Sequence, residues 1–138
     1  ADVFSSVVTW AGAPDLSSML TDELYEQAKA NGYFVMDFDW RTPLNVSLQW
    51  CEDVKNADVL GEFAAGYTGP VLAIAGTEDT TVDPEWSNRI VAASANPASK
   101  TYFIEGMDHT FNVFAEEDFH SLYQAVDATG EFFSETLH

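Results

Sequence analysis

The hydrophobic positions in the second half of the chain alternate between short apolar runs and longer runs with helical spacing. Residues 71–76, VLAIAG, carry no polar side chain, which is typical of a strand buried on both faces of a parallel sheet. A helix is expected next at 85–95, then a strand at 100–106 and a long helix at 115–135. This order predicts an α/β fold with a mostly parallel sheet between two helical layers, a three-layer α/β/α arrangement.

The first half of the chain has a less regular pattern. The elements expected first are a strand within 5–12 and a helix at 21–32, capped by Thr21 and stopped by Gly32. A strand or hairpin arm is expected at 33–40, where Arg41–Pro43 ends it, and it is followed by a helix at 45–57 and a short helix at 59–65. Residues 15–68 interrupt the strand–helix alternation. We therefore expect one α/β domain over 1–138, with 15–68 as an insertion or lid.

Composition narrows the class of protein. The chain has 138 residues, of which 46% are apolar, enough for one domain with its own core. The net charge of −18 argues against nucleic acid and anionic membranes as partners. Cys51 is the single cysteine, so neither an internal disulfide nor a cysteine pair for a metal is available. With no membrane-length apolar run and no recognisable signal peptide, a cytoplasmic protein of bacterial type is expected.

Ionisable side chains follow both strands of the second half. Asp79 lies in the loop after the first strand, and His109 lies in the loop after the second. Ligands of open parallel sheets bind at the carboxyl ends of the strands, so these loops touch if the strands are neighbours. A carboxylate that accepts from one imidazole nitrogen fixes the tautomer and leaves the other nitrogen as a general base. The pair is therefore a candidate acid–base site.

Each candidate has a structural alternative. Asp79 could be only a turn residue. Asp83 directly precedes Pro84, so a helix cap is favoured over catalysis. Asp108 could tune His109, but loop polarity is the favoured interpretation. Cys51 is expected to be a small core residue, because no basic residue close in sequence lowers its pKa.

These motifs resemble a known family. GTED and TVDP, with GMDHTF about 30 residues later, resemble the end of an α/β-hydrolase of the ferulic or cinnamic acid esterase or dienelactone-hydrolase-like type. That family carries its catalytic acid in a G-x-x-D loop after the penultimate strand and its histidine in a G-x-x-H loop after the last strand, positions that Asp79 and His109 occupy. Their order agrees with the family's Ser…Asp…His order, and SSVVTWAGAPDL at the start extends the resemblance to most of the chain.

The chain departs from the family in one important respect. It contains no G-x-S-x-G nucleophile motif and no His-Gly-rich oxyanion segment, and these supply most of the transition-state stabilisation. The resemblance therefore implies the C-terminal half of a serine ester hydrolase fold, with the nucleophile upstream of Ala1 and little activity in this chain alone. Its expected partners are a small-molecule ester and the N-terminal half of the fold, and no metal or organic cofactor is expected.

The substrate and the rival functions remain open at this point. Trp40 and Trp50 lie in the 15–68 insertion and are candidate substrate-binding residues for a bulky or aromatic acyl group, although core packing explains them about as well. One alternative is a peptidase of the same superfamily. Another is a non-catalytic α/β module that forms homo-oligomers, because a sheet that lacks its first strands exposes an edge and an apolar face.

Overall fold

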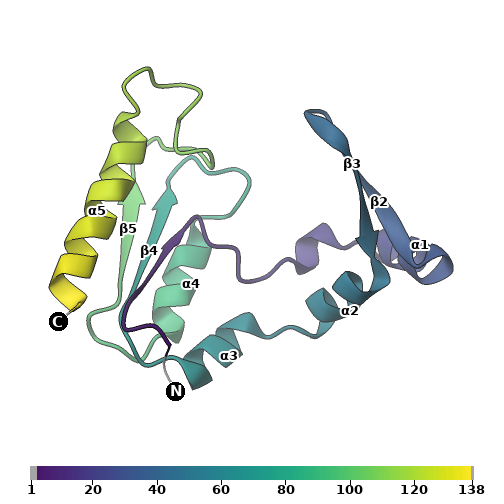
Figure 1. The fold of residues 1–138 in the computed structure, drawn as a ribbon, viewed down its shortest axis with the longest axis horizontal. Helices are drawn as coiled ribbons and strands as arrows, with labels where there is room; N and C mark the ends of the chain where they lie inside the picture. The colour runs from purple at the N-terminus through teal and green to yellow at the C-terminus, as the bar shows by residue number, and fades with distance from the viewer. Residues whose placement is uncertain (1–2, 138) are drawn as a thin grey trace. The chain divides into compact units, whose positions relative to one another are not determined.

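The computed structural model describes residues 3–137 and divides the chain into two compact units. Unit 1 combines Ala1–Pro14 with Leu60–His138, and unit 2 is Asp15–Val59. In chain order the elements are β1 (Val7–Trp10), a short 3-10 helix (Ser17–Met19), α1 (Asp22–Asn31), β2 (Tyr33–Phe38), β3 (Arg41–Ser47), α2 (Leu48–Asn56), α3 (Val59–Gly66), β4 (Val71–Gly76), α4 (Glu85–Ala93), β5 (Lys100–Ile104) and α5 (His120–Thr136) (Figure 1).

Unit 1 is built on a three-stranded parallel sheet with the strand order β1-β4-β5 (Figure 1). The central strand, β4, has all six residues buried, as its uniformly apolar sequence predicts. Val71 pairs with Val7 of β1, and Leu72 pairs with Lys100 of β5. Both loops that carry candidate site residues therefore leave neighbouring strands at the same edge of the sheet.

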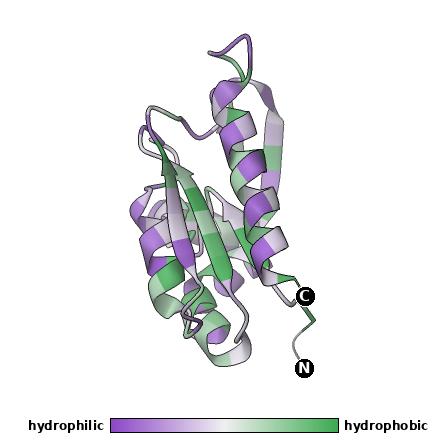
Figure 2. Ribbon diagram, turned by 90° about the vertical axis from the view of Figure 1, so that its left-hand side faces the viewer, coloured by the Kyte–Doolittle hydropathy of each residue, from purple (hydrophilic) through white to green (hydrophobic). Residues whose placement is uncertain are grey.

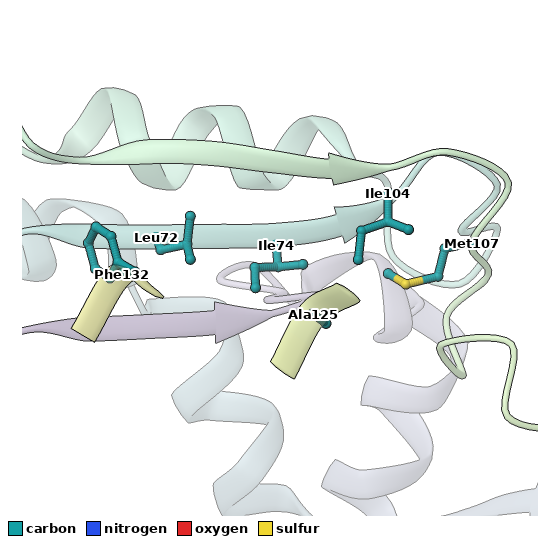
Figure 3. Packing of buried hydrophobic residues seen from close by; sticks show 6 residues of the cluster. All are labelled: Leu72, Ile74, Ile104, Met107, Ala125 and Phe132. Atoms are coloured by element: carbon teal, nitrogen blue, oxygen red, sulfur yellow. The ribbon is translucent and has the colours of Figure 1, made fainter. Parts of the chain in front are cut away.

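Alternate residues of β4 point to opposite faces of the sheet, and each face is covered by helices. On one face, β4 and β5 pack against α5 through six buried side chains: Leu72, Ile74, Ile104, Met107, Ala125 and Phe132 (Figure 3). On the other face, Val71 and Ala73 pack against Ile90 of α4, with Leu60 and Phe63 of α3 beside them. Figure 2 shows the same division, with hydrophobic strands between helices of mixed polarity. The predicted three-layer α/β arrangement is confirmed.

The last helix begins later than its periodicity predicts. A helix was expected from Ala115, but α5 begins at His120, so that start is wrong by five residues. Phe119 has a φ of 54°, a left-handed conformation that cannot continue a helix. Glu116 accepts hydrogen bonds from the backbone N–H and hydroxyl of Ser121, so its carboxylate satisfies the first turn of α5 from outside the helix.

Unit 2 packs α1, α2 and a β2–β3 hairpin around a small core of Ala28, Phe34 and Cys51. The prediction that Arg41–Pro43 ends the extended segment is wrong, because these residues open β3. The pairing register shifts between Met36 and Phe38, and Pro43 lies opposite this irregular stretch. A residue without an N–H is tolerated there because the regular hydrogen-bond ladder is interrupted.

The helix expected at 45–57 is correspondingly shorter, because β3 continues to Ser47. Helix α2 then begins at Leu48, and the Ser47 hydroxyl accepts a hydrogen bond from the Trp50 N–H at 3.2 Å. By contrast, α1 follows its sequence signals closely, with Thr21 as its N-cap and Gly32 in a left-handed C-cap. No helix within residues 3–137 is both long and apolar enough to cross a membrane.

Candidate active site

The loop after β4 can pass close to the loop after β5 only because residue 76 is glycine. A Cβ placed on Gly76 would lie 1.9 Å from the carbonyl oxygen of Met107, a backbone atom that cannot move without displacing the second loop. The backbone conformation of Gly76 itself is ordinary. The first glycine of the G-x-x-D motif is therefore needed here for close approach and not for an unusual φ.

Three hydrogen bonds join the two loops directly. The Thr77 N–H donates to the Ile104 carbonyl at 3.0 Å, and the Glu78 N–H donates to the Met107 carbonyl at 3.1 Å. In the opposite direction, the Gly106 N–H donates to the Thr77 hydroxyl at 2.9 Å. Because donors and acceptors come from both sides, the Asp79 and His109 loops form one continuous unit at the carboxyl edge of the sheet.

Asp79 is buried at the base of this unit, with 1% of its side chain exposed. One carboxylate oxygen, Oδ1, accepts from the backbone N–H groups of Thr81 at 2.9 Å and Val82 at 2.8 Å. This is a local turn in which an aspartate holds its own loop. The second oxygen, Oδ2, is left for a partner outside the loop.

That partner is His109. Its Nδ1 lies 2.9 Å from Asp79 Oδ2, within the range expected of a base and the group that orients it. An ionised carboxylate can only accept a hydrogen bond, so with Asp79 as the acceptor Nδ1 is the donor, and in a neutral imidazole Nε2 then keeps its lone pair. The imidazole is 40% exposed, and within residues 3–137 nothing hydrogen-bonds to Nε2. Nε2 is therefore open to solvent chemistry, and an imidazole held in this way can accept a proton from a reactant.

The loop that carries His109 is held by Asp108 and Asn112, which bond to each other twice. Asp108 Oδ1 accepts from the Asn112 N–H at 3.0 Å, and Asn112 Oδ1 accepts from the Asp108 N–H at 2.9 Å. Asp108 Oδ1 also accepts from the N–H and hydroxyl of Thr110. The Asn112 and Thr110 donors lower the pKa of Asp108, against a smaller effect of burial. The hydrogen bonds of Asp108 thus go to its own loop, as the loop-polarity interpretation expected.

The other candidates occupy structural positions. Asp83 Oδ1 accepts from the Glu85 N–H at 2.9 Å, which places it at the start of α4, as its position before Pro84 predicted. Cys51 is buried in the core of unit 2, and burial raises the pKa of its thiol. A thiol in that state is a poor nucleophile.

Unit 2 contains an open apolar groove of about 420 Å³, to which Trp50, Met36 and Leu44 contribute. This volume is in the range of small-molecule sites. Trp40 does not line the groove. Its side chain is exposed, and its ring packs on Phe38 at 5.4 Å between centroids. The structure thus places only one of the two candidate substrate-binding tryptophans at a groove.

Sequence reasoning missed the residues that connect the His109 loop to α5. Asn112 Nδ2 donates to Glu116 Oε1 at 2.9 Å and to Ser121 Oγ at 3.2 Å. The only sequence feature that connects Asp108, Asn112 and Glu116 is their spacing of four residues. The same spacing is equally typical of one face of a helix. Within residues 3–137, no group of three His, Cys, Asp or Glu side chains is arranged to hold a metal ion.

Comparison with known proteins defines the fold. No protein-family model matches the sequence, and no curated protein sequence matches it. Among solved structures, Est1E from Butyrivibrio proteoclasticus matches 98% of this chain with a TM-score of 0.67 and 19% identity. A monoacylglycerol lipase from Paleococcus ferrophilus matches 96% with a TM-score of 0.64 and 16% identity. The mouse α/β hydrolase domain-containing protein 10 matches 91% with a TM-score of 0.62 and 16% identity.

The chain has the α/β-hydrolase fold, which confirms the predicted resemblance at the level of the fold. At these identities the comparison concerns the fold alone. The chain spans about half the length of the first of these structures, 52% of Est1E, and 60% of the lipase. The fold does not decide the activity, which depends on the chemistry of the site.

Proposed function

We propose that this chain supplies the catalytic acid, Asp79, and the catalytic base, His109, of a serine ester hydrolase. The observation that carries the proposal is the 2.9 Å contact between Asp79 Oδ2 and His109 Nδ1, made by a buried carboxylate to a half-exposed imidazole. The fold supports it, since known structures of similar fold include an esterase domain from Rhodothermus marinus and a monoacylglycerol lipase.

In the proposed reaction, His109 Nε2 removes the proton of a serine hydroxyl as its oxygen attacks the ester carbonyl. The resulting imidazolium is stabilised by Asp79, and Nε2 then delivers the proton to the departing alkoxide. A water molecule, deprotonated by the same nitrogen, then attacks the acyl carbon; the bond to the serine oxygen breaks, and Nε2 returns the proton to that oxygen as the acid leaves. The serine and the donors that stabilise the oxyanion come from a part of the protein outside this chain.

The edge of the sheet at β1 is the proposed place for that missing part. Among the described residues, β1 pairs with β4 only, and Trp10 at its end is partly exposed. An unpaired parallel edge is a ready template for another strand. We propose that the first half of the fold adds there, either upstream in the same polypeptide or as a separate chain. A second copy of this chain on the same edge is the competing, non-catalytic arrangement.

The proposed substrate is an ester with a bulky or aromatic acyl group. Ferulic acid, an aromatic acid, is bound in a structure of Est1E that this chain matches over 98% of its length with a TM-score of 0.65 and 20% identity. The apolar groove in unit 2 is of suitable size and chemistry for an aromatic group, and Trp50 is its best candidate for stacking. The lid role of residues 15–68 and a binding role for Trp40 stay predictions.

The test is hydrolysis of p-nitrophenyl and feruloyl esters by the polypeptide obtained when the reading frame is extended upstream of Ala1, called here the extended polypeptide. We expect saturable turnover that is lost in His109→Ala, and background rates from the 138-residue chain alone. Saturable turnover by the chain alone, or full activity in His109→Ala, would contradict the proposal. Faster cleavage of matched amides than of esters would favour the peptidase alternative.

A further inference from the structure

The loop that carries His109 is anchored to α5 by a polar network outside the acid–base pair. Its members are four side chains that hydrogen-bond to one another or to the loop backbone: Asp108, Asn112, Glu116 and Ser121. None of them touches the imidazole through a hydrogen bond. The network therefore contacts the loop and not the ring.

Asn112 is the centre of this network and uses its whole side-chain amide. Its Oδ1 accepts from the Asp108 N–H, and its Nδ2 donates to the carbonyl of Gly106 at 3.2 Å, as well as to Glu116 and Ser121. Its backbone φ is 54°, in the left-handed region that asparagine tolerates better than most residues. These contacts hold the backbone on both sides of His109, at positions 106, 108 and 112.

Glu116 extends the support from the loop to the helix. Its Oε2 accepts from the Ser121 N–H at 2.7 Å, and its Oε1 accepts from the Ser121 hydroxyl at 2.6 Å and from Asn112 Nδ2. Ser121 is buried in the first turn of α5, and α5 is packed on the sheet that also carries Asp79. A connected path thus leads from the core of unit 1 to the backbone of the His109 loop.

The imidazole needs such support because its own contacts are few. Within residues 3–137 its ring makes one hydrogen bond, to Asp79 Oδ2, and 40% of the side chain is exposed. One hydrogen bond fixes a distance but leaves the ring free to tilt. The direction of Nε2 is therefore decided by where the backbone of residues 106–112 is held.

We propose that Asn112 and Glu116 are positioning residues that keep His109 Nδ1 on Asp79 Oδ2 and aim Nε2 out of the site. The catalytic consequence of this role rests on the proposed function, but the positioning itself does not. A purely structural role would lower the stability of the fold and leave the tautomer and the Nδ1–H of the folded state unchanged.

The test reads the His109 ring by proton–nitrogen NMR of the 138-residue chain, with its signals assigned by their loss in His109→Gln. Asn112→Gly removes the side chain while glycine accommodates the positive φ. Glu116→Ala removes all three acceptor contacts, and Glu116→Gln keeps one acceptor oxygen as a milder variant that is expected to fold. Glu117→Gln is the matched control, because it removes the same charge at the next residue. The Glu117 side chain is exposed and makes no hydrogen bond among the described residues.

For the unchanged chain and Glu117→Gln we expect a single Nδ1–H tautomer, with a downfield Nδ1 proton slow to exchange with water. In Asn112→Gly and Glu116→Ala the Nδ1 proton signal should be lost, and the nitrogen shifts should move to the mixed-tautomer values of a free imidazole, with Glu116→Gln intermediate. Variants that remain folded and keep the unchanged chain's Nδ1 proton and tautomer would overturn the inference.

Kinetic measurements distinguish a failure of this inference from a failure of the proposed function. In the extended polypeptide, Asn112→Gly and Glu116→Ala should reduce kcat by about 10- to 100-fold with little change in KM, because displacement of a catalytic group by about 1 Å costs up to about 100-fold. If the NMR changes occur but no form hydrolyses esters, the positioning stands and the proposed function fails. If His109→Ala abolishes activity while Asn112→Gly and Glu116→Ala retain full kcat, the function stands and the inference fails.

Discussion

The loops after β4 and β5 meet at one edge of the sheet but hold their side chains in different ways. Asp79 is fixed by backbone N–H groups two and three residues ahead of it, and it is almost fully buried. His109 is half exposed, and its loop is held by Asn112 and Glu116, which connect it to α5. Asp79 is thus held by its immediate sequence, whereas the loop of His109 is held by residues farther along the chain.

The largest expected effect comes from removing either member of the pair. In the extended polypeptide, Asp79→Asn should lower kcat/KM for a p-nitrophenyl ester by about 10³- to 10⁴-fold, because the amide no longer fixes the Nδ1–H tautomer or stabilises the imidazolium. Glu78→Gln is the control, since the Glu78 side chain is exposed and only its backbone joins the two loops. A loss of less than about tenfold in Asp79→Asn would contradict the assigned role.

The next largest effect is expected from a substitution that breaks the contact between the two loops. In Gly76→Ala, the new methyl group meets the Met107 carbonyl, so the free energy of unfolding should fall by about 3 kcal/mol. Gly130→Ala is the matched control, because its Cβ meets nothing within 4 Å, and alanine in helix α5 should stabilise by about 0.5–1 kcal/mol. Urea denaturation measures both, and equal stabilities for the two variants would show that the loops are not in close contact.

A smaller effect is expected from one hydrogen bond between the loops. Thr77→Val keeps the shape of the side chain but removes the oxygen that accepts from the Gly106 N–H, so it should cost about 1 kcal/mol of unfolding free energy. Thr80→Val is its control, since the exposed Thr80 side chain makes no hydrogen bond among the described residues. A Thr77→Val variant as stable as Thr80→Val would mean that this bond contributes nothing.

The smallest expected effect concerns the support of the His109 loop alone, and it depends on pH. Hydrogen bonds from Ser121, and then from Asn112, lower the pKa of Glu116 from 4.5 to about 2. Because the folded state favours the ionised form, the stability from Glu116 is complete above about pH 4.5 and is lost as the pH falls toward 2.

Thermal unfolding tests the direction of this pH dependence. The midpoint of the unchanged chain should exceed that of Glu116→Gln by a few degrees near pH 6, and the difference should shrink as the pH falls through this window. Glu117→Gln should show no such convergence with the unchanged chain. A difference that grows as the pH falls would contradict the hydrogen-bond pattern at Glu116.

The difference between the local support of Asp79 and the more distant support of His109 also explains what could be predicted from the sequence. The buried strand β4 follows from a short local pattern, and the closeness of Asp79 and His109 follows from their places after neighbouring strands. The position of Asp83 at the start of α4 follows from its place before Pro84. Asn112 and Glu116 could not be assigned, because their roles depend on a left-handed backbone and on a helix that begins only at His120.

Unit 2 shows the same limit of local reasoning. Helix α1 was predicted correctly from Thr21 and Gly32, whose cap interactions are local. Strand β3 was missed because Pro43 normally argues against a strand, and only the irregular pairing with β2 makes it acceptable. Trp40 and Trp50 were equivalent candidates in the sequence. Their exposure differs because Trp40 lies in the turn between β2 and β3, whereas Trp50 lies in the first turn of α2.

The proposed role of Asp79 and His109 is to activate a serine that lies outside this chain. The most direct measurement is labelling of the extended polypeptide with a fluorophosphonate, followed by mass spectrometric location of the modified residue. We expect one labelled serine upstream of Ala1, with labelling strongly reduced in His109→Ala. A label on a serine between Ala1 and His138, or labelling at the same rate in His109→Ala, would contradict it.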